Sequence, residues 1–226
     1  MGQMSYTTYL FDFDYTLADS SCGIILCFRN VLQRHNYTNV TDDAIKRTIG
    51  KTLEESFSIL TGIMDTEQLA ALRKEYSKES DQYMNINTHL FDDTLPTLLK
   101  LKEEGNRLGI ISTKYRFRIQ DFMRKQLPEE WFNIIVGGED VNHPKPNPEG
   151  LLFAMKKLNV TPEETMYIGD SIVDAETAQA AGVSFTGITS GVTRSEELAQ
   201  YPHVKIISNL RELTDLPKTL FLLRNT

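Results

Sequence analysis

Three aspartates lie within the short segment LFDFDYTLADSS, residues 10 to 21. Asp12 and Asp14 alternate with Phe11 and Phe13, so on a strand both carboxylates point away from the phenylalanine side. Two carboxylates this close repel each other, and each is costly at the edge of an apolar core unless a cation compensates it. The segment therefore predicts a site where carboxylates meet a cation, and the rest of the chain must supply the partners.

Other polar residues follow apolar runs or stand in a stiff loop. They are Ser112 and Thr113 in IIST, Lys145 between the prolines of HPKPNP, and Asp170 and Asp174 in GDSIVD. In an open α/β sheet, ligands bind beyond the carboxyl ends of the strands, so we expect these side chains to converge. Because Mg²⁺ is a hard ion that prefers oxygen ligands, the carboxylates predict a magnesium site.

The elements that must position these residues alternate between strands and helices. Six short apolar segments are predicted as strands, and they cover 8–13, 108–113, 133–138, 165–170, 183–188 and 204–208. Amphipathic helical stretches separate most of them, which is typical of an α/β protein with a mostly parallel sheet. Residues 22–88 contain only helical patterns, so we expect a helical insertion there, with 1–21 and 89–226 forming the α/β domain.

Composition and charge exclude several classes of protein. The chain has 226 residues, of which 40% are hydrophobic and 24% charged, an ordinary globular composition. Its net charge of −7, without a lysine- or arginine-rich run, argues against a nucleic-acid partner. No segment approaches the roughly 20 apolar residues of a membrane span. The start of the chain also lacks the basic and apolar pattern of a signal peptide, so we expect a cytoplasmic protein with no membrane partner.

Four motifs carry a resemblance to a known family. DFDYTL, IIST, KPNP and GDSIVD resemble the four motifs of the haloacid dehalogenase-like hydrolase superfamily, and they occur in the family's order. The helical insertion after the first motif is similar to that superfamily's small helical cap. The resemblance implies a Rossmann-like parallel-sheet core, an inserted α-helical cap domain at residues 22–88, and a magnesium-dependent phosphatase.

The resemblance also implies roles for the aspartates. Asp12 would attack phosphorus to form an aspartyl-phosphate, which is covalent catalysis by a carboxylate. Asp14 would act as general acid and then as general base. Mg²⁺ would be held by the Asp12 side chain, the Asp14 backbone carbonyl and Asp170. Asp174 would hold the metal site or Lys145 in position from outside the first layer of contacts.

The remaining site residues would bind substrate. Ser112 and Lys145 would hold the transferring phosphoryl group, and Thr113 is placed beside them. Tyr15 stands where the family usually has glycine. Because tyrosine tolerates a positive φ poorly, we expect a right-handed turn there and a ring that lines or crowds the pocket. Lys51, at the corner IGKTLEE, is expected to meet the non-transferring end of an acidic substrate, or else to be a solvated surface lysine.

The family resemblance leaves several functions open. Asp14 argues against the dehalogenase and phosphonatase branches, and the phosphoglycolate phosphatase-like branch fits best, with a small phosphorylated metabolite as partner. A phosphomutase of the β-phosphoglucomutase type is an alternative, although its fourth motif usually has Glu-Asp where this chain has Gly169 and Asp170. An inorganic pyrophosphatase and a catalytically silent binding protein on the same fold are further alternatives. We expect a monomer or a homodimer.

Overall fold

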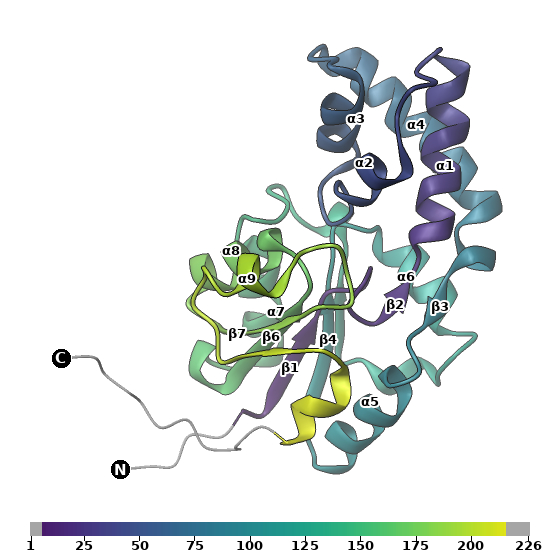
Figure 1. Ribbon diagram of the computed structural model, residues 1–226. Coiled ribbons are helices and arrows are strands. Elements are labelled where there is room, and N and C mark those ends of the chain that lie inside the picture. Colours follow the sequence, from purple (N-terminus) through teal and green to yellow (C-terminus); the bar gives the residue numbers. More distant parts are fainter. Residues whose placement is uncertain (1–5, 216–226) are drawn as a thin grey trace.

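A six-stranded parallel sheet forms the centre of the computed structural model, which describes residues 6–215 (Figure 1). The strand order is β5-β4-β1-β6-β7-β8, with each neighbouring pair parallel. The strands are β1 (Thr8–Phe11), β4 (Arg107–Ile111), β5 (Ile134–Val136), β6 (Thr165–Gly169), β7 (Ser184–Ile188) and β8 (Lys205–Ile207). Each lies within, or within one residue of, a predicted segment, and the predicted α/β parallel-sheet fold is confirmed.

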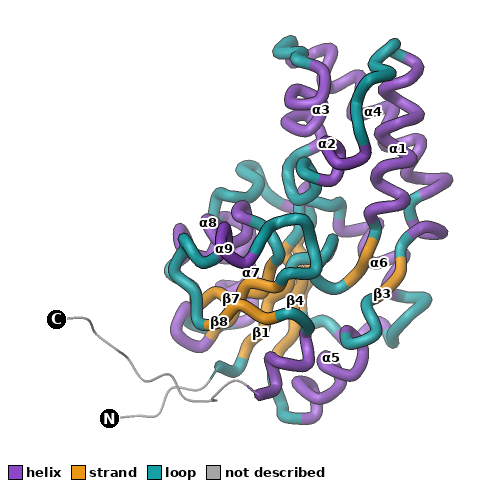
Figure 2. Tube along the Cα trace, viewed as in Figure 1, coloured by secondary structure: helices purple, strands orange, loops and turns teal. Residues whose placement is uncertain are grey.

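Helices cover both faces of this sheet (Figure 2). Consecutive strand residues point to opposite faces, so Phe11 packs in one apolar cluster and Leu10 in the other. The first cluster includes Leu98 of α5 and Ile119 of α6, and the second includes Leu151 of α7. The helices are α5 (Thr94–Glu103), α6 (Arg116–Met123), α7 (Glu149–Leu158), α8 (Ile172–Ala181) and α9 (Ser195–Leu198).

The helical insertion lies beyond the carboxyl ends of the strands (Figure 1). It has an apolar cluster of its own, in which the rings of Phe28, Phe57 and Tyr76 pack against one another. Thr52 caps the third helix by accepting a hydrogen bond from the Glu55 N–H at 3.2 Å. Its helices are α1 (Ser21–Arg34), α2 (Asp42–Lys46), α3 (Leu53–Thr61) and α4 (Thr66–Tyr83). We call this insertion the cap and the α/β part the core; the boundaries at 21/22 and 88/89 stay a prediction.

Two short strands mark the crossings between the core and the cap. The strands β2 (Ala18–Asp19) and β3 (His89–Leu90) pair in antiparallel fashion, so the chain enters and leaves the cap side by side. Five 3-10 helices complete the described secondary structure: Asn85–Asn87, Glu129–Trp131, Gly138–Asp140, Pro162–Glu164 and Leu210–Asp215.

Candidate active site

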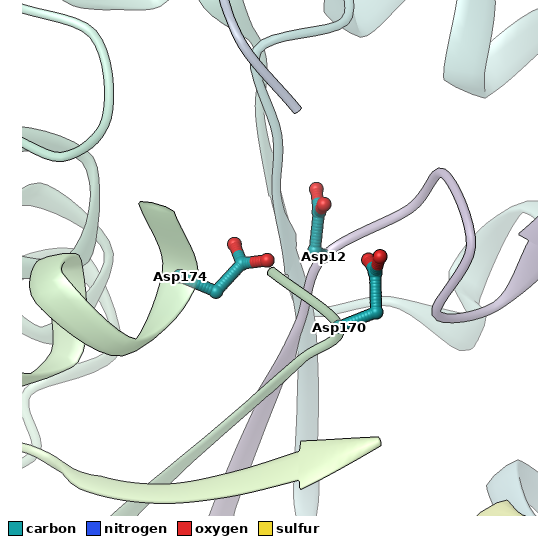
Figure 3. Close-up of side chains that lie close together, drawn as sticks. All are labelled: Asp12, Asp170 and Asp174. Atoms are coloured by element: carbon teal, nitrogen blue, oxygen red, sulfur yellow. The ribbon is translucent and has the colours of Figure 1, made fainter. Parts of the chain in front are cut away.

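Three buried aspartates meet at the carboxyl edge of the sheet. Asp12 follows β1, Asp170 follows β6, and Asp174 lies in the first turn of α8. One carboxylate oxygen from each residue lies within 4.8 Å of the others. Figure 3 shows the Asp12 and Asp170 carboxylates side by side, with Asp174 reaching toward them from its helix. The sheet thus brings together aspartates from two separate sequence motifs, as the sequence predicted.

Lys145 joins this cluster from the loop between β5 and α7. Its ammonium lies 3.0 Å from an Asp12 oxygen and 2.6 Å from an Asp174 oxygen, and the lysine is buried. The Tyr167 hydroxyl lies 3.1 Å from the same ammonium and 2.8 Å from Asp174 Oδ1. These contacts fix the lysine between two carboxylates, and the two negative charges raise its pKa, against the opposing effect of its burial.

The second oxygen of Asp174 is also occupied. The backbone N–H and the hydroxyl of Ser171 both donate to Asp174 Oδ2, at 3.1 and 2.6 Å. Although Asp174 is geometrically part of the three-carboxylate group, both of its oxygens therefore have protein donors. This arrangement agrees with the predicted supporting role better than with direct ligation of a metal.

Asp12 and Asp170 are buried carboxylates whose negative charge a bound cation would stabilise. Burial raises the pKa of Asp12 to about 6, with Asp174 and Asp14 adding to the effect and Lys145 opposing it. Burial, followed by the charges of Asp174 and Asp12, raises the pKa of Asp170 well above its usual range. Among the described residues no hydrogen-bond donor satisfies Asp12 Oδ1, although Lys145 lies close. A divalent cation held by oxygen ligands would offset this buried charge, so the donor set fits Mg²⁺.

Asp170 is held in place from two sides. The Thr16 hydroxyl donates to Asp170 Oδ1 at 3.3 Å. On the other side Gly191 approaches so closely that a Cβ at that position would collide with Asp170 Oδ2. Only glycine therefore allows the backbone at position 191 to lie this close to the Asp170 carboxylate.

Asp14 faces away from the aspartate cluster and lines a cavity between cap and core. Its Oδ1 lies 2.6 Å from the Lys114 ammonium and also accepts a hydrogen bond from the Ser20 hydroxyl. Lys114 directly follows Ser112 and Thr113 in the sequence and belongs to the same group of polar residues at a strand end, but the sequence predicted no role for it.

Ser112 and Thr113 have different environments. Ser112 is buried and lines a small pocket together with Lys145, and its hydroxyl accepts a hydrogen bond from the Lys114 N–H at 3.3 Å. The Thr113 hydroxyl instead donates to the backbone oxygen of Gly50 in the cap, at 3.2 Å. Thr113 thus ties the core to the cap as well as lining the cavity.

The prediction of a right-handed turn at Tyr15 was wrong. Its φ is 61°, in the left-handed region. Tertiary contacts hold it there, because its N–H donates to Ala18 O at 2.8 Å and its carbonyl accepts a hydrogen bond from the Ser190 hydroxyl. The ring is buried and is not among the residues that line the cavity, so the expected pocket-lining role is also not supported.

Lys51 does lie at the tip of the cap corner and lines the cavity. Its ammonium is 2.6 Å from Glu55, one helical turn further on, and both side chains are partly exposed. Its predicted contact with substrate therefore competes with an ion pair inside the cap.

The parallel sheet, the carboxylate cluster at its carboxyl edge and the helical insertion beyond that edge agree with the architecture expected of a haloacid dehalogenase-like hydrolase. The sequence matches the haloacid dehalogenase-like hydrolase family over residues 9–188, and the chain belongs to this family. The structure is similar to the crystal structure of a haloacid dehalogenase-like hydrolase from Bacteroides fragilis. The TM-score is 0.91 at 68% identity, covering 92% of this chain and 99% of that one.

Two relatives place the chain among the phosphatases of the family. It is 34% identical over 199 residues to a phosphoglycolate phosphatase from Colwellia psychrerythraea, covering 85% of this chain and 88% of that protein. It is 28% identical over 210 residues to the pyrophosphatase PpaX of Oceanobacillus iheyensis, covering 93% and 96%. The predicted family and the predicted enzyme class, a phosphatase, are confirmed. In residues 6–215 no helix is both long and apolar enough to span a bilayer.

Proposed function

We propose that the protein hydrolyses small phosphate monoesters in a Mg²⁺-dependent reaction that passes through an aspartyl-phosphate on Asp12. The observation that carries the proposal is the placement of Asp12, which is 2% exposed, has the Lys145 ammonium 3.0 Å from one oxygen, and has an Asp170 oxygen within 4.8 Å. A buried carboxylate beside a fixed cation is suited to receive a dianionic phosphoryl group. When bound by Asp12, the Asp14 carbonyl and Asp170, Mg²⁺ would supply further positive charge at the phosphoryl oxygens.

In the first step a carboxylate oxygen of Asp12 attacks phosphorus, and the bond from phosphorus to the ester oxygen breaks. Lys145 and Ser112 hold the phosphoryl oxygens while negative charge develops. Asp14 gives its proton to the departing oxygen, which leaves as an alcohol. Its position at the wall of the cavity suits this task, because a leaving group held in the cavity would lie within reach of its carboxylate.

In the second step water attacks the phosphorus of the aspartyl-phosphate. Asp14, now ionised, takes a proton from that water, and the bond from phosphorus to Asp12 breaks. Inorganic phosphate leaves, and the Asp12 carboxylate is restored. Asp174 keeps Lys145 in position through both steps by its 2.6 Å contact.

Phosphoglycolate is the first candidate substrate, supported by the 34% identity to the Colwellia psychrerythraea phosphoglycolate phosphatase. Pyrophosphate is the second candidate, supported by the relatives named pyrophosphatase PpaX, one of which spans 93% of the chain. A panel of phosphate metabolites assayed for released phosphate separates these substrates. Conversion of β-glucose 1-phosphate to glucose 6-phosphate would instead favour the phosphomutase alternative.

The decisive experiment compares Asp12→Asn with wild type on p-nitrophenyl phosphate, with Mg²⁺ and with EDTA. Because uncatalysed phosphate-monoester hydrolysis is so slow that enzymes accelerate it by up to ~10²¹-fold, loss of the nucleophile should abolish turnover. Asp121→Asn, which alters an exposed ion pair with Arg124, is the matched control and should retain full activity. Asp12→Asn activity within roughly tenfold of wild type would remove Asp12 from the nucleophile role. Full activity in EDTA would contradict the metal assignment.

A further inference from the structure

The cavity between cap and core is large for a two-carbon leaving group. Its volume is about 380 Å³, and Asp14 forms part of its wall. Pockets of roughly 300–1,000 Å³ are typical for drug-sized ligands. Glycolate, the leaving group of phosphoglycolate, would occupy only a small part of this volume.

The cap is already docked on the core, so the volume does not reflect a cap swung away from the site. Three hydrogen bonds join cap and core around the cavity. They run from Thr113 Oγ1 to Gly50 O at 3.2 Å, from Arg73 Nη1 to the Tyr115 hydroxyl at 3.1 Å, and from Arg118 Nη2 to Ser77 O at 2.9 Å. The space therefore belongs to the docked arrangement, in which the leaving group would be enclosed.

The charge of the cavity wall is opposite to that of the chain. Four cationic side chains but only two carboxylates line it, in a protein whose net charge is −7. The cations are Lys51, Arg73, Lys114 and Arg118, and the carboxylates are Asp14 and Glu54. The excess arises because Glu55 and Asp81, the partners of Lys51 and Arg118, do not line the cavity, and it favours an anionic group against this wall.

All four cations have a carboxylate partner, but the two arginines keep further N–H donors beyond those that face their partners. Lys114 is engaged with Asp14, and Lys51 with Glu55. Arg73 lies on α4, and Arg118 reaches Ser77 O one turn further along the same helix, so their guanidinium groups flank one turn of α4. Each guanidinium carries five N–H donors in a fixed fork.

The carboxylate partners of these two arginines are partly exposed. The side chain of Glu54, at 2.6 Å from Arg73, is 41% exposed, and that of Asp81, at 2.8 Å from Arg118, is 64% exposed. The Arg73 side chain is 36% and that of Arg118 13% exposed, and each guanidinium keeps N–H donors for a second anion beside its carboxylate partner.

The same stretch of α4 also presents an apolar wall. Tyr76 is three residues after Arg73, so both lie on one face of the helix. Phe28, Ile24 and Met84 line the cavity beside Tyr76, and their side chains are otherwise buried in the cap. Aromatic and aliphatic side chains next to arginine suit a ligand that has an apolar body and an anionic end.

We propose that the preferred substrate is a phosphate monoester whose leaving group combines a ring-sized apolar body with an anionic group. The body packs against Phe28 and Tyr76, and the anionic group is held by Arg73 and Arg118. This inference rests on the proposed phosphatase function and makes its substrate class specific. Phosphoglycolate, the first candidate by similarity to a relative, meets the charge requirement but not the size requirement, so the cavity favours a larger substrate.

Three phosphate esters with primary alcohol leaving groups test the two requirements separately. Benzyl phosphate has the body without the anion, phosphoglycolate the anion without the body, and 4-carboxybenzyl phosphate has both. We expect kcat/KM for 4-carboxybenzyl phosphate to exceed that for each of the others by roughly tenfold or more. A kcat/KM for phosphoglycolate equal to or above that of 4-carboxybenzyl phosphate would overturn the proposal.

Variants locate the anion site. Arg118→Gln should lower the ratio of kcat/KM between 4-carboxybenzyl and benzyl phosphate by about fivefold or more, because a charge-assisted contact is lost. Asp81→Asn, which removes the exposed partner of Arg118 but keeps the guanidinium, is the control and should leave the ratio unchanged. If Arg118→Gln does not fold, the same ratio is measured for Arg73→Gln. An unchanged ratio in every folded arginine variant would overturn the assignment.

The experiments distinguish an error in the proposed substrate class from an error in the proposed phosphatase function. If p-nitrophenyl phosphate is hydrolysed in an Asp12- and Mg²⁺-dependent manner but the carboxylate confers no preference, only the substrate class is wrong. If none of the esters releases phosphate, the phosphatase mechanism itself is wrong.

Discussion

Replacement of Tyr167 by phenylalanine tests whether the buried network behind Asp12 supports both stability and catalysis. Tyr167 is fully buried, and its hydroxyl lies 2.8 Å from Asp174 Oδ1, 3.1 Å from the Lys145 ammonium and 3.1 Å from Ile111 O. Tyr167→Phe removes one oxygen and leaves the ring in place, so no large cavity forms. The effect therefore isolates the hydrogen bonds.

The expected loss follows from what remains in the network. Hydrogen bonds to charged groups contribute roughly 1.5–3 kcal/mol each. Lys145 keeps its 2.6 Å contact with Asp174, whose other oxygen keeps Ser171, so neither charge loses its last partner. We therefore expect the free energy of unfolding to fall by about 2 kcal/mol. For a chain of this size that corresponds to a decrease in Tm of about 4–8 °C.

The assay is thermal and urea unfolding of the metal-free protein, followed by steady-state kinetics with Mg²⁺. Since Lys145 is also less firmly positioned, kcat should fall up to roughly tenfold with KM little changed. Tyr201→Phe is the control, because Tyr201 is only partly buried and its hydroxyl donates to a single partner, Glu176, at 3.1 Å. This variant should change stability by no more than about 0.5 kcal/mol. Equal, small Tm shifts in both variants would refute the reasoning.

Three further predictions follow from the site. The pKa of Asp12 is raised to about 6 in the folded protein, so the metal-free protein should lose stability as pH rises from about 4 to 6, where only the folded state keeps this proton. Mg²⁺ should then raise Tm more at pH 8 than at pH 5, and equal shifts would contradict the metal assignment. Asp14→Asn should slow hydrolysis of alkyl phosphates by ~10²–10⁴-fold and that of p-nitrophenyl phosphate less, and an equal loss would count against the acid role. Lys51→Ala should raise KM for phosphoglycolate only about threefold, because Lys51 already pairs with Glu55, and leave KM for p-nitrophenyl phosphate unchanged. The same change for both substrates would make Lys51 a solvated lysine.

The convergence of Asp12, Asp170 and Lys145 could be predicted because it depends on one rule of architecture. Parallel strands end at the same edge of a sheet, so residues far apart in the chain meet wherever strand ends can be recognised. The strand pattern and the motif order located those ends. The short strands β5 and β8 were predicted with ends one or two residues too long. The excess residues include Gly137 and Gly138, at which the sheet pairing of β5 has already ended.

The parts that could not be predicted depend on tertiary contacts without a local pattern. The pair between Asp14 and Lys114 joins residues 100 positions apart, and nothing in either motif specifies that the two side chains point at each other. From the sequence, Arg73 and Arg118 resemble ordinary cations on helix surfaces. Their proximity depends on how the cap docks on the core. The left-handed conformation of Tyr15 opposes its own propensity and depends on the contact with Ser190 from another loop.

The environments of the two motif aspartates support different roles for them without reference to any relative. Asp12 is 2% exposed and closed in by Lys145 and Asp170, whereas Asp14 is 7% exposed and forms part of the cavity wall. A nucleophile gains from being fixed and shielded, because it must meet phosphorus in one orientation. A general acid and base must instead reach both the leaving oxygen and the incoming water. Each aspartate faces its own lysine, Asp12 in the interior and Asp14 at the cavity, so the adjacent carboxylates are compensated separately. The repulsion expected between carboxylates two residues apart is thus reduced, because the Asp12 and Asp14 side chains lie in different surroundings.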